Sequence, residues 1–299
     1  MAPESQTSRA TAYGLAAIVA WGITTGLLRI IGESFGAALG TALYCTLGAG
    51  LLWIFRRPKS LRDLPARYLW VTGALFVIYN VSFGLSLGFA KDANQALEVS
   101  IVNYLWPTLM VAFSVALPPW RKVGWTLIPG ILLAVIGIGQ VVSGDAGLNP
   151  SKIVENVSTY PLPYALGLCA AVSWGLYSVL APRLAKGHDG ITVFFTATAA
   201  SAWLVYAAVG EAIPAAVDAR AILALLAGAV LVSVGYACWN VGITHGNLTL
   251  LASASYATPI LASGSGALLL GATLGWAFWQ GVALVTVGSL LSWWATRRN

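Results

Sequence analysis

One stretch of the sequence constrains the fold more than any other feature. From Ala221 to Thr296 the chain runs for 76 residues without a single Asp, Glu, Lys or Arg. A helix that crosses the hydrocarbon core of a bilayer needs about 20 apolar residues, so this stretch predicts three spans joined by short turns. Charged residues make up only 9% of the whole chain, against about 25% in a soluble domain. The sequence therefore predicts a polytopic membrane protein and disfavours a soluble enzyme or a nucleic-acid-binding protein.

Charged residues and clusters of Gly and Pro divide the apolar sequence into ten predicted helices. Strands are disfavoured because the long apolar runs show no alternation with a period of two. The expected fold class is thus an all-α polytopic membrane protein with ten transmembrane helices. The expected spans are 11–31, 36–55, 67–90, 94–117, 123–143, 162–184, 190–210, 219–243, 248–270 and 274–296.

The basic residues predict the orientation of these spans. Twelve of the 16 Lys and Arg residues fall on one side of the predicted membrane and four on the other. Positive residues collect in cytoplasmic loops, so both termini are expected in the cytoplasm. The cytoplasmic group is Arg9, Arg56, Arg57, Lys59, Arg62, Arg67, Arg121, Lys122, Arg183, Lys186, Arg297 and Arg298. The opposite group is Arg29, Lys91, Lys152 and Arg220.

The two halves of the chain resemble each other. Trp21-Gly22 corresponds to Trp174-Gly175, and the Tyr-x-x-Pro that ends at Pro107 corresponds to the one that ends at Pro259. Each half has five predicted helices, an odd number, so the second half must be inverted, as in many transporters. The predicted divisions are a cytoplasmic leader (1–10), a first five-helix repeat (11–143), a periplasmic linker (144–161), a second five-helix repeat (162–296) and a cytoplasmic tail (297–299).

This pattern resembles the drug/metabolite transporter superfamily, and its repeats resemble the EamA type. The resemblance is carried by the Trp-Gly pair in the first helix of each half and by the proline in the fourth, and it covers nearly the whole chain. It implies a transporter with a central cavity that is opened to each side in turn, with Pro107 and Pro259 as hinges because proline removes a backbone hydrogen bond. One departure is that many EamA repeats carry an acid near the end of the fourth helix, where this chain has residues 117–119 (LPP) and 270–272 (LGA).

Two predicted helices carry the same aromatic and amide stripe. Residues 76, 79, 80 and 83, and residues 236, 239, 240 and 243, both follow the spacing i, i+3, i+4, i+7, which places each set on one helix face. A cavity lined by rings with a few amides and hydroxyls suits an amphiphilic solute with a ring. The alternative is that the rings pack inside the bundle and the amides join helices. The expected substrate-binding residues are Trp21, Tyr79, Asn80, Phe83, Asn103, Tyr104, Trp174, Tyr177, Tyr236, Trp239, Asn240, Ser255 and Tyr256.

Glu98 is the one acid well inside a predicted span. If it couples transport to protons, it must gain and lose a proton during the cycle. The alternative is a structural carboxylate near the N-terminus of the fourth helix, where the helix dipole favours an anion. We favour the second interpretation, and with it uniport.

The resemblance and the aromatic residues together imply export of amino acids, aromatic or otherwise apolar, across a bacterial inner membrane. One alternative is a sugar-phosphate or nucleotide-sugar antiporter of the same superfamily. Phosphate requires cationic partners, and the interiors of the third, fourth, eighth and ninth predicted helices contain no Lys or Arg. A second alternative is an intramembrane enzyme, but no His lies within a predicted span to act as a base. We expect no enzymatic activity, metal or cofactor, and as partners a small-molecule amino acid and the lipid bilayer, without nucleic acid.

Overall fold

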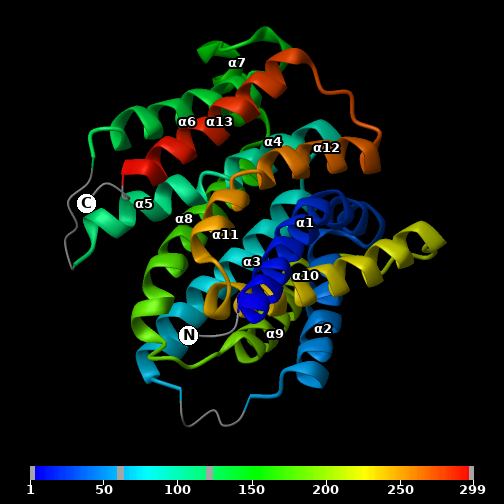
Figure 1. The fold of residues 1–299 in the computed structure, drawn as a ribbon. Coiled ribbons are helices and arrows are strands. Elements are labelled where there is room, and N and C mark those ends of the chain that lie inside the picture. The colour runs from blue at the N-terminus through cyan, green and yellow to red at the C-terminus, as the bar shows by residue number, and fades with distance from the viewer. Residues whose placement is uncertain (1–3, 59–63, 119–123, 296–299) are drawn as a thin grey trace.

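The computed structural model describes residues 4–58, 64–118 and 124–295, and in this part of the chain every regular element is a helix (Figure 1). In chain order the elements are α1 (Glu4–Phe35), α2 (Ala37–Phe55), the π-helical turn η1 (Tyr68–Thr72), α3 (Gly73–Gly88), α4 (Ala93–Asn103), α5 (Trp106–Ala116), α6 (Leu127–Val142), the 3-10 turn η2 (Gly144–Ala146), α7 (Pro150–Thr159), α8 (Pro161–Leu184), α9 (Ile191–Val209), α10 (Ala219–His245), α11 (Leu248–Ser255), α12 (Thr258–Leu270) and α13 (Trp276–Ala295).

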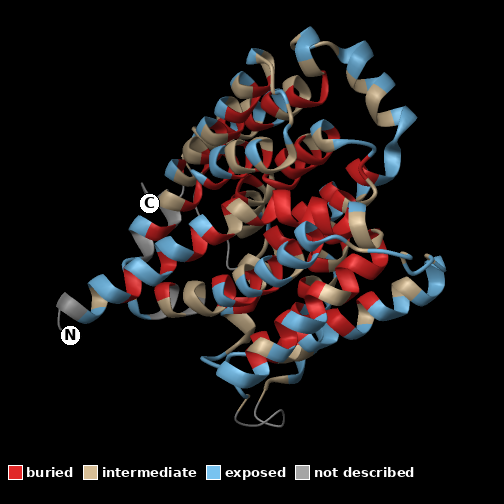
Figure 2. Ribbon diagram, turned by 90° about the vertical axis from the view of Figure 1, so that its right-hand side faces the viewer, coloured by how far each residue is buried: buried red, intermediate tan, exposed pale blue. Residues whose placement is uncertain are grey.

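The helical class and the membrane character agree with the sequence. Within the described residues, seven helical segments are long and apolar enough to cross a membrane, when η1 with α3 and α4 with α5 are each counted as one. Helices α6 and α12 are shorter apolar helices. Buried residues fill the middle of the bundle, and exposed residues cover its outer faces (Figure 2). Large apolar side chains lie on those faces, including Trp125, which is 79% exposed, and Leu268, which is 87% exposed. Such a surface is expected where lipid replaces water.

Two of the expected helices are interrupted near their middle. We expected the fourth and ninth helices as continuous spans that bend at Pro107 and Pro259, but the structure separates α4 from α5 and α11 from α12 just before these prolines. Proline has no N–H and crowds the carbonyl group four residues earlier. That carbonyl belongs to Asn103 in the first break and to Ser255 in the second. In the second break the Thr258 hydroxyl supplies the missing donor, since it lies 2.6 Å from the Ser255 carbonyl oxygen.

Helices are present in both segments that flank the first predicted repeat. The helix of α1 begins at Glu4 and so covers much of the expected leader. The expected linker contains α7, whose N-terminus is capped by the Asn149 side chain. Ile153 and Val157 of α7 pack against a cluster that includes Tyr164. This apolar face holds α7 against the bundle, so the linker is a docked helix.

The sequence assigns Arg29 to the non-cytoplasmic side, near the end of the predicted span 11–31, and the structure shows it as a buried residue of α1, only 5% exposed. Its guanidinium donates hydrogen bonds to the carbonyl oxygens of Leu87 at 3.0 Å and Gly88 at 3.2 Å, and it pairs with Glu33 at 2.7 Å. The last carbonyls of a helix have no intrahelical partner and carry a partial negative charge. Arg29 therefore caps α3 and ties it to α1, which explains how a cation is tolerated there.

Helices α6 and α13 pack closely along one side of the molecule (Figure 1). A Cβ atom added to Gly130 would lie 2.7 Å from the Gly288 carbonyl oxygen, and one added to Gly137 would lie 2.7 Å from the Gly281 carbonyl oxygen. Because 130 faces 288 and 137 faces 281, the two helices run antiparallel. Glycine is required at these positions because the backbones touch.

Helices α2 and α9 show a matching pair of contacts. The Trp53 indole donates to the Thr196 hydroxyl at 2.9 Å, and the Trp203 indole donates to the Thr46 hydroxyl at 2.9 Å. Because residue 53 meets residue 196 and residue 46 meets residue 203, these two helices also run antiparallel.

Candidate functional site

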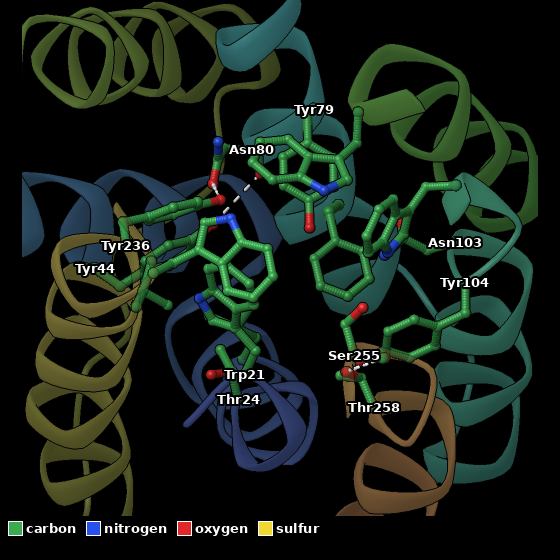
Figure 3. A pocket seen from close by; sticks show the side chains of 16 residues that line it. Trp21, Thr24, Tyr44, Tyr79, Asn80, Asn103, Tyr104, Tyr236, Ser255 and Thr258 are labelled. Atoms are coloured by element: carbon green, nitrogen blue, oxygen red, sulfur yellow. Dashed lines mark hydrogen bonds between the residues drawn. The ribbon is translucent and has the colours of Figure 1, made fainter. Parts of the chain in front are cut away.

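A pocket lies at the centre of the bundle and contains about 700 Å³ of empty space, part of it open to solvent (Figure 3). Its walls come from both halves of the chain. It is lined by Trp21, Thr24, Leu28, Tyr44, Tyr79, Asn80, Phe83, Asn103, Tyr104, Trp106, Trp174, Val232, Tyr236, Trp239, Ser255 and Thr258.

Ten of the thirteen side chains expected at the site line this pocket: Trp21, Tyr79, Asn80, Phe83, Asn103, Tyr104, Trp174, Tyr236, Trp239 and Ser255. Two others, Tyr177 and Tyr256, are not among its lining residues. The side chain of Asn240 lies outside the described part of the structure, as does that of Ile243. The two sequence stripes and the Trp-Gly helices thus converge on one place.

Two pairs of rings form the aromatic walls. Trp174 of α8 stacks on Tyr79 of α3, with centroids 4.5 Å apart and 29° between the ring planes. Trp21 of α1 lies against Trp239 of α10, with centroids 5.3 Å apart and 51° between the planes. Each wall joins one helix from the first half to one from the second. Stacked and tilted rings at this spacing present flat apolar surface for another ring.

A buried aromatic core supports these walls from behind. Phe76, the first residue of its stripe, is completely buried and contacts the rings of Trp174, Tyr177 and Tyr236 at centroid distances of 6.1, 5.5 and 5.2 Å. Tyr177 stacks on Trp174 at 4.8 Å. Helical spacing placed Phe76 and Tyr177 on the correct face, but they lie one layer deeper than the pocket.

Asn80 joins helices in addition to lining the pocket. Its Oδ1 accepts a hydrogen bond from the Tyr236 hydroxyl at 3.2 Å, and its Nδ2 donates to the Phe76 carbonyl oxygen at 2.9 Å. The Tyr44 hydroxyl donates to the Asn80 carbonyl oxygen at 3.4 Å. The amide therefore has partners of its own within the protein, in line with the alternative that it connects helices.

The sequence did not single out six lining residues: Thr24, Leu28, Tyr44, Trp106, Val232 and Thr258. Thr24 and Leu28 follow Trp21 by three and seven positions, so the helical period around Trp21 would have found them. Trp106 and Thr258 directly precede the two prolines. Val232 precedes Tyr236 by four positions and Trp239 by seven, so the period of the second stripe would have found it as well. No comparable signal marks Tyr44, which is brought in by the packing of α2.

The pocket wall is uncharged. None of the sixteen lining residues in the described part of the chain is Asp, Glu, Lys or Arg, and the wall offers hydroxyls, amides and indoles as its polar groups. The described residues also contain no group of three or more His, Cys, Asp or Glu side chains that could hold a metal ion. The wall therefore offers ring surface and neutral hydrogen-bonding groups to a solute.

Glu98 lies outside the pocket wall. Asp92 is the N-cap of α4 and accepts a hydrogen bond from the Gln95 backbone N–H at 2.8 Å, which places Glu98 in the second turn. A helix dipole acts mainly within the first turn, so it contributes little to holding the Glu98 carboxylate. Its Oε2 instead accepts a hydrogen bond from the hydroxyl of Tyr164 on α8. The contact that fixes Glu98 is this link between α4 and α8.

An apolar helical bundle with an uncharged aromatic pocket at its centre is typical of a small-molecule membrane transporter. Comparison with known proteins places the chain among such transporters. Residues 161–294 match the EamA-like transporter family, and the chain belongs to that family.

The similar proteins span nearly the whole chain. It is 43% identical to the aromatic amino acid exporter YddG of Salmonella typhimurium and 42% identical to that of Escherichia coli, over 97% of this chain and 99% of each relative. It is 29% identical to the YddG exporter of Ancylobacter novellus, over 86% of this chain and 87% of that one. A crystal structure with 22% identity has the same fold, with a TM-score of 0.61 over 97% of both chains. The family resemblance inferred from the sequence is therefore confirmed.

Proposed function

We propose that the protein exports aromatic amino acids from the cytoplasm across a bacterial inner membrane. The observation that carries this proposal is the central pocket, which combines stacked rings from both halves with a wall of neutral polar groups. Three relatives bear the name aromatic amino acid exporter, and two of them match over nearly full length. An aromatic amino acid has the matching chemistry, because its ring can stack and its zwitterionic head group has no net charge.

The proposal includes ten transmembrane helices in two inverted five-helix repeats, with both termini in the cytoplasm. The divisions remain those of the sequence: leader 1–10, repeat 11–143, periplasmic linker 144–161, repeat 162–296 and tail 297–299. Support comes from the antiparallel packing of α6 on α13 and of α2 on α9 through exchanged contacts. An odd number of helices in each half is the arrangement that places equivalent helices in opposite directions.

Alternating access is proposed to occur by bending at the two helix breaks. Pro107 and Pro259 follow breaks that lie beside the pocket, since Asn103 and Ser255, the last residues of α4 and α11, line it. At each break the regular ladder of backbone hydrogen bonds is interrupted and turn bonds remain, such as Leu105 N–H to the Val102 carbonyl oxygen at 3.1 Å, so the two parts of the helix can change their angle at low cost. Movement there would change the shape of the pocket directly.

A phosphorylated sugar or nucleotide fits this site poorly. Recognition of phosphate relies on Arg or Lys, and the sixteen lining residues of the described structure include neither. An intramembrane enzyme would need a nucleophile next to a base, and the relatives carry the names of transporters. Amino acid transport is thus the function that the pocket and the family both support.

The direct test is flux of labelled phenylalanine, tyrosine and tryptophan in proteoliposomes that contain the purified full-length protein. We expect downhill flux of all three that is saturable and is competed by each of the others. Glycerol 3-phosphate and a nucleotide sugar serve as controls and should neither be transported nor compete. Transport of either phosphorylated compound without transport of aromatic amino acids would overturn the proposal.

A further inference from the structure

One polar atom in the pocket wall has no partner within the protein. Asn103 is only 2% exposed and lines the pocket, and its Oδ1 accepts no hydrogen bond in the described structure. A buried acceptor without a donor is costly. Asn80, the other amide in the wall, does have partners. Asn103 Oδ1 therefore stands out as an acceptor in the pocket wall that no donor of the described structure satisfies.

The position of Asn103 in its helix favours a positively charged donor. Asn103 is the last residue of α4, directly before the break that precedes α5. The final carbonyls of a helix have no intrahelical partners and give that end a partial negative charge. An ammonium group next to Asn103 would therefore meet an amide oxygen and the negative end of a helix.

A helix end of opposite sign lies on the same side of the pocket. The 13-residue helix α12 begins at Thr258, which lines the pocket. The first N–H groups of a helix have no intrahelical acceptor and favour an anion, although Pro259, the second residue of α12, supplies none. Helices α4 and α12 pack together, with Ile101 and Ala262 in one buried cluster. In the view of Figure 3, Asn103 and Tyr104 lie on the same side of the pocket as Ser255 and Thr258, away from Asn80 and Tyr236.

We propose that this side of the pocket binds the zwitterionic head group of a free α-amino acid. Asn103 Oδ1 accepts a hydrogen bond from the α-ammonium, and the N-terminus of α12 holds the α-carboxylate, while the substrate ring lies against the aromatic walls. This inference rests on the proposed function and extends it to specificity. A ring compound that lacks the ammonium or the carboxylate binds more weakly, because one of the two helix ends is left without its counterpart.

The test compares three ligands that share one ring: phenylalanine, 3-phenylpropionate, which lacks the ammonium, and 2-phenylethylamine, which lacks the carboxylate. Binding to the purified full-length protein in detergent is measured by titration calorimetry, and competition with labelled phenylalanine is measured in proteoliposomes. The wild type should bind each analogue about tenfold or more weakly than phenylalanine.

Two variants of Asn103 and one control separate recognition from structure. Asn103→Ala should weaken phenylalanine binding about tenfold while leaving 3-phenylpropionate within about twofold of the wild type, so that the preference for the ammonium disappears. Asn103→Asp keeps acceptor oxygens and should retain or increase that preference. Asn94→Ala removes an exposed amide at the start of the same helix and should leave the affinity for both ligands unchanged.

The outcomes separate this inference from the proposed function. An equal loss of affinity for phenylalanine and 3-phenylpropionate in Asn103→Ala would show a structural role and overturn the ammonium contact. If that variant does not fold, Asn103→Asp decides, since a reduced preference for phenylalanine overturns the inference. Equal binding of phenylalanine and 2-phenylethylamine by the wild type would overturn the carboxylate site. A wild type that transports no aromatic amino acid contradicts the proposed function, whereas transport with no preference for the intact head group contradicts this inference alone.

Discussion

The Trp174 ring stacks on the Tyr79 ring with centroids 4.5 Å apart, although the two residues lie in different halves of the chain. The contact between Trp21 and Trp239 on α1 and α10 has the same relation to the two halves. Each aromatic wall of the pocket is therefore shared by both halves. Relative movement of the halves would separate or shift the rings, which links substrate contact to conformational change.

Removing one ring from these walls should weaken transport of aromatic substrates. Trp239→Ala or Tyr79→Ala removes stacking area worth about 0.5–1.5 kcal/mol beyond simple burial. We expect the half-saturating concentration of tryptophan to rise by roughly threefold to tenfold in proteoliposome flux assays. Trp276→Ala is the control, because Trp276 is 75% exposed on the outer face. If the pocket variants and the surface variant have the same half-saturating concentration at equal protein content, the pocket rings serve only to pack the helices together.

Loss of the Asn80 amide should reduce stability more than it reduces substrate affinity. Asn80→Ala leaves the buried Tyr236 hydroxyl without its acceptor, which costs about 1–3 kcal/mol. Thermal unfolding in detergent should therefore shift to lower temperature. Tyr236→Phe in the Asn80→Ala background should recover part of the loss, since it removes the unpaired hydroxyl. An unchanged unfolding temperature with lower affinity would instead assign Asn80 mainly to the substrate.

Arg29 should be essential to the packing of α3 on α1. Arg29→Leu removes hydrogen bonds from a charged donor to the Leu87 and Gly88 carbonyl oxygens, and such bonds contribute about 1.5–3 kcal/mol each. We expect a large fall in the unfolding temperature. Glu33→Gln should have a smaller effect, because the Glu33 side chain is 47% exposed and exposed ion pairs contribute little. Comparable losses in both variants would contradict this assignment.

Glu98 should be dispensable for downhill flux. Its carboxylate accepts a hydrogen bond from Tyr164 outside the pocket wall, so Glu98→Gln should keep most of the flux and show no response to an imposed pH gradient. Tyr164→Phe, which removes the donor, is the matched variant and should behave similarly. The prediction fails if the wild type accumulates substrate under a pH gradient and Glu98→Gln abolishes that accumulation.

The proposed orientation can be checked with accessibility tags. A tag after Asn299 and one in the loop at Arg62 should be cytoplasmic, and one at Asn149 should be periplasmic, because the basic residues divide twelve to four. Residues 299 and 62 lie outside the described part of the structure. Labelling of intact cells with a reagent that does not cross the inner membrane gives the measurement. A periplasmic Asn299 would contradict both the helix count and the inverted repeat.

Much of the pocket could be predicted because helical periodicity decides which residues share a face. The stripe through Tyr79, Asn80 and Phe83 lines the pocket, as do Trp21 and Trp174 of the Trp-Gly motifs. Periodicity does not give depth, however. Tyr177 lies behind Trp174, and Tyr256 contacts Trp293 at a centroid distance of 6.2 Å.

The membrane class, the helical fold and most of the pocket could be predicted from the sequence, because hydropathy and the period of 3.6 are local properties of a chain; the family was inferred from the Trp-Gly and proline motifs shared by the two halves. Which polar groups already have partners depends on the tertiary structure. Arg29 is buried because the end of α3 lies beside it, and Asn80 is bonded because Tyr236 reaches it from α10. Asn103 Oδ1 remains without a partner in the described structure. Hydrogen bonds between distant segments depend on angles and distances that no local pattern encodes.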